Sequence, residues 1–269
     1  MDLQREGTMR TTTWHLIRTM KTIRKLSLFL FIAVSLALGS CEKDGSAGMT
    51  FRTGDIVTVT RPVNGNFTGI YLNDNVNLVL TQAASFSIRV EGGENILGGI
   101  KTDISDNTLT ISNTNRFNWM RTYNKQVTAY VSMPHLLILN YEATGTVSCT
   151  DTIREDSLSV TAKGGSGYIN LIIRTGTSKL SITSGSADMN IRGKTGVNFI
   201  FSGGYGPFHC LDLESNFLFM RNASPNDCYV NVVNHFEYEI TGLGNIYYRG
   251  NPPEISGSRT GGGQLIKQD

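Results

Sequence analysis

Histidines and carboxylates carry most acid–base catalysis, and this chain holds them in no recognisable arrangement. Apart from His15 near the N-terminus, its histidines are His135, His209 and His235. None shares a catalytic motif with an acid, and lone histidines of this kind are more often structural or surface residues. The acids of the C-terminal half are scattered along the chain: Asp212, Glu214, Asp227, Glu237 and Glu239. A glycan-cleaving site needs clustered acids, so the sequence predicts no catalytic residue and a protein that is not an enzyme.

The other reactive groups do not form a metal or cofactor site either. No Cys or His spacing matches a zinc site. The Gly-rich segment 164–167 has the composition of a phosphate loop, but strand residues follow it instead of a helix N-terminus. Cys210 and Cys228 lie about one repeat apart, and a disulfide between them is geometrically conceivable. Because neighbouring parallel strands aim their Cβ atoms alike, we expect buried free thiols rather than a disulfide. We also expect no metal and no cofactor.

The stretch 113–125 interrupts the pattern of short strands with aromatic and basic side chains. Phe117, Trp119, Arg121 and Tyr123 alternate there with other residues. Exposed on a loop, such side chains stack on sugars or anchor a protein partner, so they are candidate ligand contacts. The favoured alternative is a hairpin loop or end cap whose rings fold back onto the body of the domain.

Cys41 has the setting of a lipidation site. Residues 20–25 are basic, residues 26–38 form an apolar run too short to span a membrane, and two small residues precede the cysteine. This arrangement resembles the lipobox of bacterial lipoproteins, in which the cysteine is lipidated and becomes the mature N-terminus. Ordinary signal cleavage beside a chance cysteine is the alternative.

The lipobox resemblance implies that an N-terminal lipid attaches the protein to a membrane. Residues 1–40 are then a signal peptide with an upstream extension, since Met20 opens a complete signal by itself. Residues 41–50 are a lipidated flexible tether, too polar to fold alone. Acids just after Cys41 weakly resemble the surface-export signal of some Bacteroidetes lipoproteins. We expect an outer-membrane lipoprotein at the cell surface, or otherwise one that faces the periplasm.

The charge balance excludes an obvious nucleic-acid partner. Residues 1–40 hold six Lys and Arg and two Asp and Glu, out of 24 and 22 in the whole chain. The remainder therefore has 18 basic and 20 acidic residues, a net charge of −2. It contains no basic patch interleaved with aromatic residues, so we expect no nucleic-acid binding.

The elements that must position any site are short strands separated by small turns at a constant spacing of about 19 to 20 residues. The alternation of Leu180 and Ile182 with Ser181 and Thr183 has the period of a strand with one buried face. Gly recurs in the turns, which we attribute to positive φ. The turns from 139 to 250 are at residues 143–146, 164–167, 184–187, 203–206, 222–225 and 241–244.

This regularity predicts an all-β, single-domain β-solenoid, similar to a β-helix, over residues 51–269. Each coil takes about 20 residues, with about six coils between 139 and 250. A two-strand unit cannot bury its apolar face alone, whereas stacked units share a continuous core. An antiparallel sandwich with regular turns is the alternative.

Several segments together resemble a known family. They are the leader, the motif MPHL at 133–136, the Gly-rich turns, and Gly244, Asn245 and Ile246 near the end. The order is similar to that of the Bacteroidetes family of putative auto-transporter adhesins with a head GIN domain, whose function is unknown. The resemblance covers roughly residues 55–267. It implies a β-helical fold and an adhesive role without a catalytic site, although the turns at 203–207 and 222–227 depart from the Gly-rich pattern.

Three functions follow as hypotheses. The first is a non-enzymatic binding or adhesion module on the cell envelope, whose partner is a glycan or a cell-surface protein. The second is a structural scaffold that forms a homo-oligomer through the open edges of the solenoid. The third, less favoured, is a glycan-active β-helix enzyme.

Overall fold

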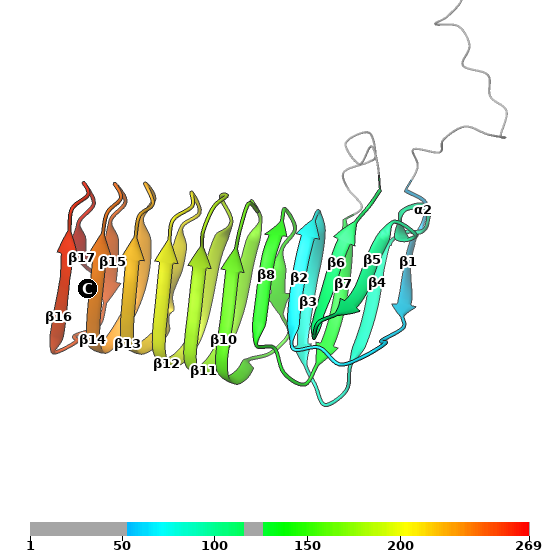
Figure 1. The fold of residues 1–269 in the computed structure, drawn as a ribbon, viewed down its shortest axis with the longest axis horizontal. Helices are drawn as coiled ribbons and strands as arrows, with labels where there is room; N and C mark the ends of the chain where they lie inside the picture. The colour runs from blue at the N-terminus through cyan, green and yellow to red at the C-terminus, as the bar shows by residue number, and fades with distance from the viewer. Residues whose placement is uncertain (1–52, 116–125, 269) are drawn as a thin grey trace, which may run out of the picture. The chain divides into compact units, whose positions relative to one another are not determined.

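The computed structural model describes residues 53–115 and 126–268, which form one hydrogen-bonded ladder of strands wound into two facing layers (Figure 1). In hydrogen-bonded order, the front layer contains β5 (Ile100–Ser105), β6 (Thr108–Asn113), β2 (Gly69–Asp74), β8 (Ile138–Ala143), β10 (Ile153–Ala162), the later halves of β11 to β14, and β16 (Glu254–Arg259). The back layer contains β1 (Ile56–Arg61), β4 (Ser87–Gly93), β7 (Val127–Met133), β3 (Val76–Gln82), β9 (Val147–Cys149), the first halves of β11 to β14, β15 (Ile246–Arg249) and β17 (Leu265–Lys267).

Four long strands pass from one layer to the other and make the ladder continuous. They are β11 (Tyr168–Ile182), β12 (Asp188–Ser202), β13 (Phe208–Asn222) and β14 (Cys228–Ile240). They pair in parallel, Tyr168 opposite Asp188 and Phe208 opposite Cys228, so the coil length is about 20 residues. The predicted solenoid is therefore confirmed, and the parallel register excludes the antiparallel sandwich.

The N-terminal part departs from simple winding. The coil formed by β2 and β3 lies between the pair β6 and β7 and the pair β8 and β9, although β6 and β7 follow it in sequence. Antiparallel strands occur here: β4 pairs with β1 and β7, and β5 pairs with β6. The segment 95–104 contains the end of the short helix α2 (Glu94–Leu97) and most of β5.

The core between the layers is built by the predicted alternation. Leu180 and Ile182 point inward and are buried, and the same positions in the next coil hold Ile200 and Ser202. Each fully buried Leu or Ile contributes about 1.5–3 kcal/mol. Residues Thr50–Asp269 cluster as one compact unit, and every buried side chain among the described residues lies in it. This unit therefore has a complete core of its own.

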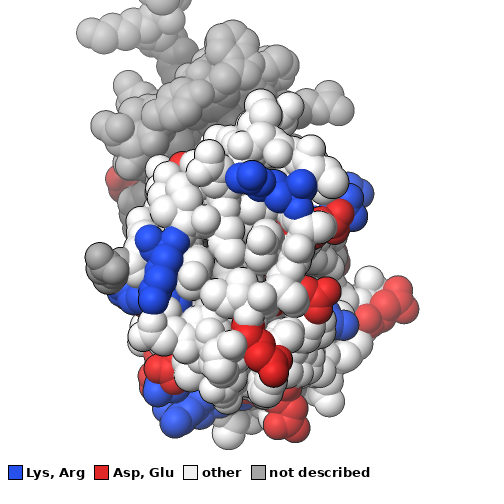
Figure 2. All heavy atoms as spheres, turned by 90° about the vertical axis from the view of Figure 1, so that its left-hand side faces the viewer, with Lys and Arg blue, Asp and Glu red and all other residues white. Residues whose placement is uncertain are grey.

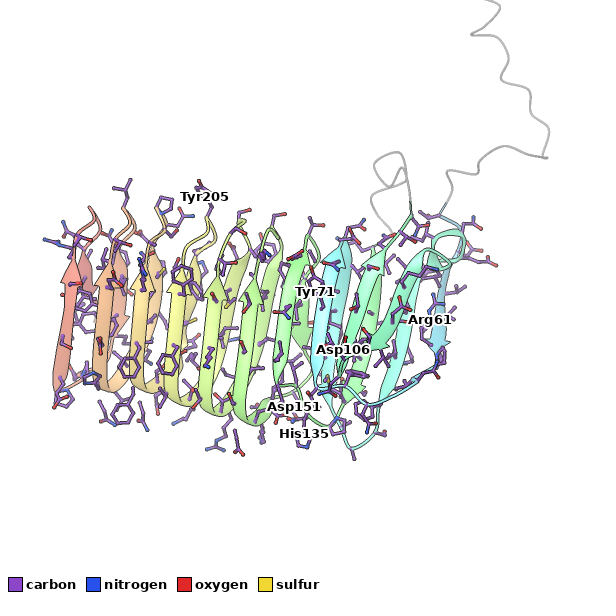
Figure 3. The ribbon with its side chains drawn as sticks, viewed as in Figure 1. Arg61, Tyr71, Asp106, His135, Asp151 and Tyr205 are labelled. Carbon is purple, nitrogen blue, oxygen red and sulfur yellow. The ribbon has the colours of Figure 1, made fainter. Side chains whose placement is uncertain are left out.

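Glycine at the corners serves two purposes. Gly164 and Gly185 have φ of +78° and +80°, as the turn argument predicts. Gly206 and Gly244 do not have positive φ; a Cβ on either would overlap a carbonyl oxygen of the preceding coil. Positive φ therefore explains only part of the pattern, and the close stacking of successive corners explains the rest. The corners line one long edge, from which Tyr205 projects, and His135 and Asp151 lie at the opposite edge (Figure 3).

The cysteines follow expectation. Cys210 and Cys228 are free and buried, which confirms the predicted free thiols. Burial raises the pKa of Cys210 to about 12 and that of Cys228 to about 11. Figure 2 looks onto the C-terminal end of the coils, where basic and acidic side chains alternate around the rim and gather in no basic patch. Among the described helices, none is long and apolar enough to cross a membrane.

Candidate functional site

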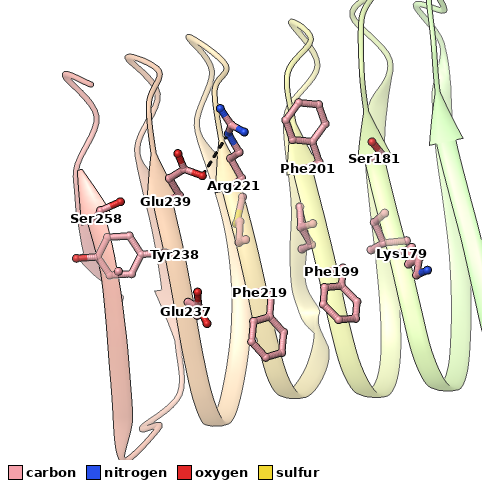
Figure 4. Close-up of a pocket in the computed structure, with 14 residues that line it drawn as sticks. Lys179, Ser181, Phe199, Phe201, Phe219, Arg221, Glu237, Tyr238, Glu239 and Ser258 are labelled. Carbon is pink, nitrogen blue, oxygen red and sulfur yellow. Dashed lines mark ion pairs between the residues drawn. The ribbon is translucent and has the colours of Figure 1, made fainter. Parts of the chain in front are cut away.

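A groove crosses the outer surface of the front layer (Figure 4). It runs perpendicular to the strands, over β11, β12, β13, β14 and β16, and has a volume of about 950 Å³. A groove of this volume is at the upper end of the range for small-molecule sites in proteins.

Two rows of outward side chains form the walls of the groove. Every second residue of a strand points outward, and the parallel register lines up equivalent positions of successive coils. The lower row consists of Lys179, Phe199, Phe219 and Glu237. The upper row consists of Ser181, Phe201, Arg221, Glu239 and Ser258. Between the rows, the main chain of Leu180, Ile200 and Met220 forms the floor, and their side chains are buried below it.

The middle of the groove is aromatic. Phe199 and Phe219 stack with ring centroids 5.1 Å apart and an interplanar angle of 17°, close to the spacing of neighbouring strands. Phe199 remains 42% exposed, and Phe201 faces it across the groove from the same strand (Figure 4). Exposed apolar surface of this kind, gathered in one place, is typical of a binding site.

The two ends of the groove differ in charge. Lys179 lies at the β11 end and is exposed, with no acidic partner in the described part of the chain. At the other end, Nε of Arg221 lies 3.3 Å from a carboxylate oxygen of Glu239, and Glu237 stands beside this ion pair without a basic partner among the described residues. The groove is therefore cationic at one end, apolar in the middle and acidic at the other end.

The back layer carries a second, more polar row. The Nδ2 of Asn190 donates to Oδ1 of Asn170 at 3.0 Å. His209 and Tyr229 stack with centroids 5.5 Å apart, and Tyr229 and Tyr247 with centroids 5.1 Å apart. Rings stacked along the coils present their edges to solvent, so this row offers hydrogen-bonding groups and no open ring face. The adjoining hollow of about 380 Å³ is lined also by Arg192 and Asp212 and is smaller than the groove.

The three described histidines lie apart from one another. His135 bonds through Nδ1 to Glu155 at 3.2 Å, and the same buried carboxylate accepts from the Leu136 N–H at 3.0 Å. His209 lies in the back layer, whereas His235 lies in the front layer with its Nδ1 3.0 Å from a carboxylate oxygen of Glu254. These side chains occupy three separate places. Within residues 53–115 and 126–268, no three His, Cys, Asp or Glu side chains come together to hold a metal.

The candidate ligand contacts predicted from sequence are other residues than those of the groove. Cys41 and the aromatic set Phe117, Trp119, Arg121 and Tyr123 lie outside the described residues, so both remain predictions. Sequence reasoning missed the groove, yet a signal was present. Aligning the repeats by about 20 residues places the aromatic residues 199, 201 and 219 at the same outward positions as Lys179 and Ser181.

Comparison with known proteins assigns the family. A family model described as "Putative auto-transporter adhesin, head GIN domain" matches residues 66–252, well over half of the chain. The chain belongs to this family. The predicted resemblance is thereby confirmed. No curated protein matches this chain.

Solved structures support the head GIN fold. A putative adhesin from Bacteroides fragilis is 20% identical, with a TM-score of 0.74 over 81% of this chain and 99% of that one. A putative lipid binding protein from Parabacteroides distasonis is 18% identical, with a TM-score of 0.63 over 80% and 98% of the chains. A putative adhesin from Parabacteroides merdae is 16% identical, with a TM-score of 0.60 over 80% and 97%. At these identities the likeness shows the fold alone.

The motif Gly244, Asn245 and Ile246, which contributes to the family resemblance, forms a structural corner of the head GIN domain. Gly244 stacks against the Asn226 carbonyl, and Ile246 is fully buried. The Asn245 N–H donates to Oδ1 of Asp227 at 2.7 Å, and Oδ1 of Asn245 accepts from the Gln264 N–H at 2.9 Å. Asn245 therefore links the preceding and following coils, and the motif holds the register of the stack.

Proposed function

We propose that this head GIN domain protein is a non-enzymatic binding or adhesion module of the bacterial cell envelope, anchored through a lipid on Cys41. The observation that carries the binding role is the apolar groove across five strands of the front layer. Family membership supports an adhesin-like role, and the leader sequence supports the lipid anchor.

The phenyl rings of this groove are not needed to maintain the fold. The outward positions held by Phe199 and Phe201 are held by Lys179 and Ser181 in the preceding coil, which stacks equally well. The solenoid therefore does not need phenyl rings there. Since an exposed ring gains little until something covers it, a ligand or partner accounts for this surface better than folding does.

The test uses cells that express the full chain with an epitope tag at its C-terminus. Separate samples of intact cells are treated with protease or labelled with an antibody to the tag, with a periplasmic protein as control. Attachment of the cells to mucin-coated wells is measured in parallel. We expect the tag to be cleaved and labelled while the periplasmic control survives, and Cys41→Ala to release the protein from the membrane fraction.

The role of the groove is tested in the same attachment assay with a groove variant and a control variant. Phe199→Ser with Phe219→Ser should reduce attachment, whereas Phe217→Ser should not, because Phe217 is 44% exposed but lies outside the groove. Protection of the tag until the outer membrane is broken would overturn the surface role. Equal attachment by all variants would overturn binding through the groove.

A second candidate is a self-associating scaffold. Every residue of β16 is exposed, and this strand pairs with β14 alone among the described strands. The terminal coil places Gly257 and Arg259 at inward positions, opposite Tyr238 and Ile240. Such a coil offers little apolar surface to a further copy, as expected of a cap. Dimers of the purified unit in sedimentation, lost on Ile255→Lys, would nevertheless favour the scaffold.

A further inference from the structure

We propose that the groove binds the hydrocarbon chain of an unbranched medium-chain fatty acid, with its carboxylate at Lys179. The inference rests on the proposed binding function and names the ligand class. It depends on three features of the front layer, which are the width of the groove, its apolar middle and the opposite charges of its ends.

The dimensions of the groove select a narrow, unbranched occupant. Its two walls stand on residues i−1 and i+1 of the same strands, so they are separated by about 7 Å between Cα positions. Its length spans the four strand spacings from β11 to β16, which amounts to about 19 Å. A single extended hydrocarbon chain matches this long and narrow shape, whereas a branched glycan or a folded protein surface is too wide to reach the floor.

The chemistry of the walls selects an apolar occupant. Phe199 and Phe219 form the lower wall, Phe201 faces them, and none of the three brings a hydrogen-bonding group into the middle of the groove. In the stacked pair each ring covers one face of the other, which leaves less open ring face on which sugars could stack. Methylene groups lose no hydrogen bonds in such surroundings, and their transfer out of water is favourable in free energy.

The charges set the direction of the ligand. Lys179 offers an ammonium that has no acidic partner among the described residues at the β11 end, where a carboxylate completes an ion pair. At the far end Glu239 is already paired with Arg221, and Glu237 repels a second anion. The acid headgroup therefore lies at Lys179, and the methyl end of the chain points towards Glu237.

The unit Thr50–Asp269 is the material for the test, since it contains the whole described core and corresponds in extent to the solved relatives. The probe is dansyl-labelled undecanoic acid, whose fluorescence rises on entering an apolar site. Dodecanoic acid and the uncharged dodecanol serve as competitors. Far-ultraviolet circular dichroism and thermal melts verify that each variant keeps the fold.

The variants separate the walls from the headgroup site. We expect saturable probe binding that weakens about tenfold or more in Phe199→Ser with Phe219→Ser, and less than about twofold in Phe217→Ser. Lys179→Gln should weaken dodecanoic acid by about threefold to fivefold and leave dodecanol unchanged. Added salt should reduce the advantage of the acid over the alcohol in the wild type only.

The outcomes also distinguish the ligand from the function. Equal probe binding by wild type and the double Phe variant overturns the proposal, and so does a Lys179→Gln effect that is the same for acid and alcohol. If the double variant loses cell attachment but the purified unit binds no probe, the fatty acid is wrong and the adhesion role stands. If probe binding follows the predictions but attachment does not change, the site stands and adhesion through it is wrong.

Discussion

Tyr141 joins two successive corners of the solenoid, and replacing it by Phe tests how the stack is held together. The ring is fully buried on β8. Its hydroxyl donates to the Gly145 carbonyl at 2.6 Å and accepts from the Gly167 N–H at 3.0 Å, one coil further along. Tyr141→Phe keeps the ring and removes both bonds. The buried Gly167 N–H then loses the hydroxyl that accepts its hydrogen bond.

The expected loss follows from these contacts. A buried polar group left without a partner costs about 1–3 kcal/mol. The Gly145 carbonyl is only half-buried and can accept a hydrogen bond from water instead. We therefore expect the free energy of unfolding to fall by about 2 kcal/mol, which lowers Tm by about 4–8 °C in a unit of this size. The matched control is Tyr205→Phe, because Tyr205 is 68% exposed and should change stability by less than about 0.5 kcal/mol.

The pH dependence gives an independent check on the same residue. Burial raises the pKa of Tyr141 to about 12 from its ordinary value of 10.0. The folded state therefore favours the protonated phenol. Its contribution to stability is complete below pH 10 and is lost as the pH rises through about 12. The stability gap between wild type and Tyr141→Phe should be constant from pH 7 to about 9.5 and shrink above that.

Urea unfolding of the unit Thr50–Asp269, followed by circular dichroism at several pH values, measures both effects. The midpoint should fall in Tyr141→Phe without a change in slope, which shows a change in stability rather than in the surface exposed. A Tyr141→Phe variant as stable as wild type, together with a flat pH response, would refute the role of this hydroxyl. A similar loss in Tyr205→Phe would show that the method does not resolve the contact.

Three further changes probe the corners, the thiols and the buried hydrogen bonds of Asn198. Gly206→Ala should destabilise by about 2–4 kcal/mol in urea titrations because its Cβ overlaps a carbonyl of the coil below, whereas Gly98→Ala, with open space around it, should be tolerated. In a Cys149→Ser unit, which removes the partly exposed third thiol, Cys210 and Cys228 should react with a maleimide only after unfolding, since burial raises their pKa values to about 12 and about 11; labelling of this unit while it is folded would contradict the prediction. Asn198→Ala should cost about 1–3 kcal/mol in thermal melts because it removes the hydrogen bonds of this buried side chain to Ser178 and Ser215, and an unchanged Tm would show that these bonds contribute nothing.

The coil could be predicted because two local signals agree. Leu180 and Ile182 alternate with polar residues, as Val160 and Ala162 do one coil earlier, with small corners between. Each signal depends on residues close in sequence. The order of the N-terminal strands could not be predicted in this way, since alternation says which face of β2 is buried but not which strand lies beside it. That choice is made by β6 and β8, whose residues 108–111 and 138–141 pair with residues 69–72.

The groove was hidden for a different reason. The run Phe199, Ile200, Phe201 reads as continuous core, and a short apolar run does not reveal its own phase. The preceding coil resolves the ambiguity: Leu180 stands in register with Ile200, so Ile200 points inward and both phenyl rings point outward. Only the comparison between coils exposes this.

The same comparison indicates where function is encoded in such a fold. Inward positions must fill the core, mostly with apolar side chains, and corner positions such as Gly206 and Gly244 must stay small because a Cβ there overlaps the preceding coil. Outward positions carry neither constraint, as the change from Lys179 to Phe199 to Glu237 along one row demonstrates. A solenoid can therefore change its ligand by changing outward side chains alone, without loss of stacking. The aromatic centre and charged ends of the groove are the part of this sequence that stacking does not explain, and binding does.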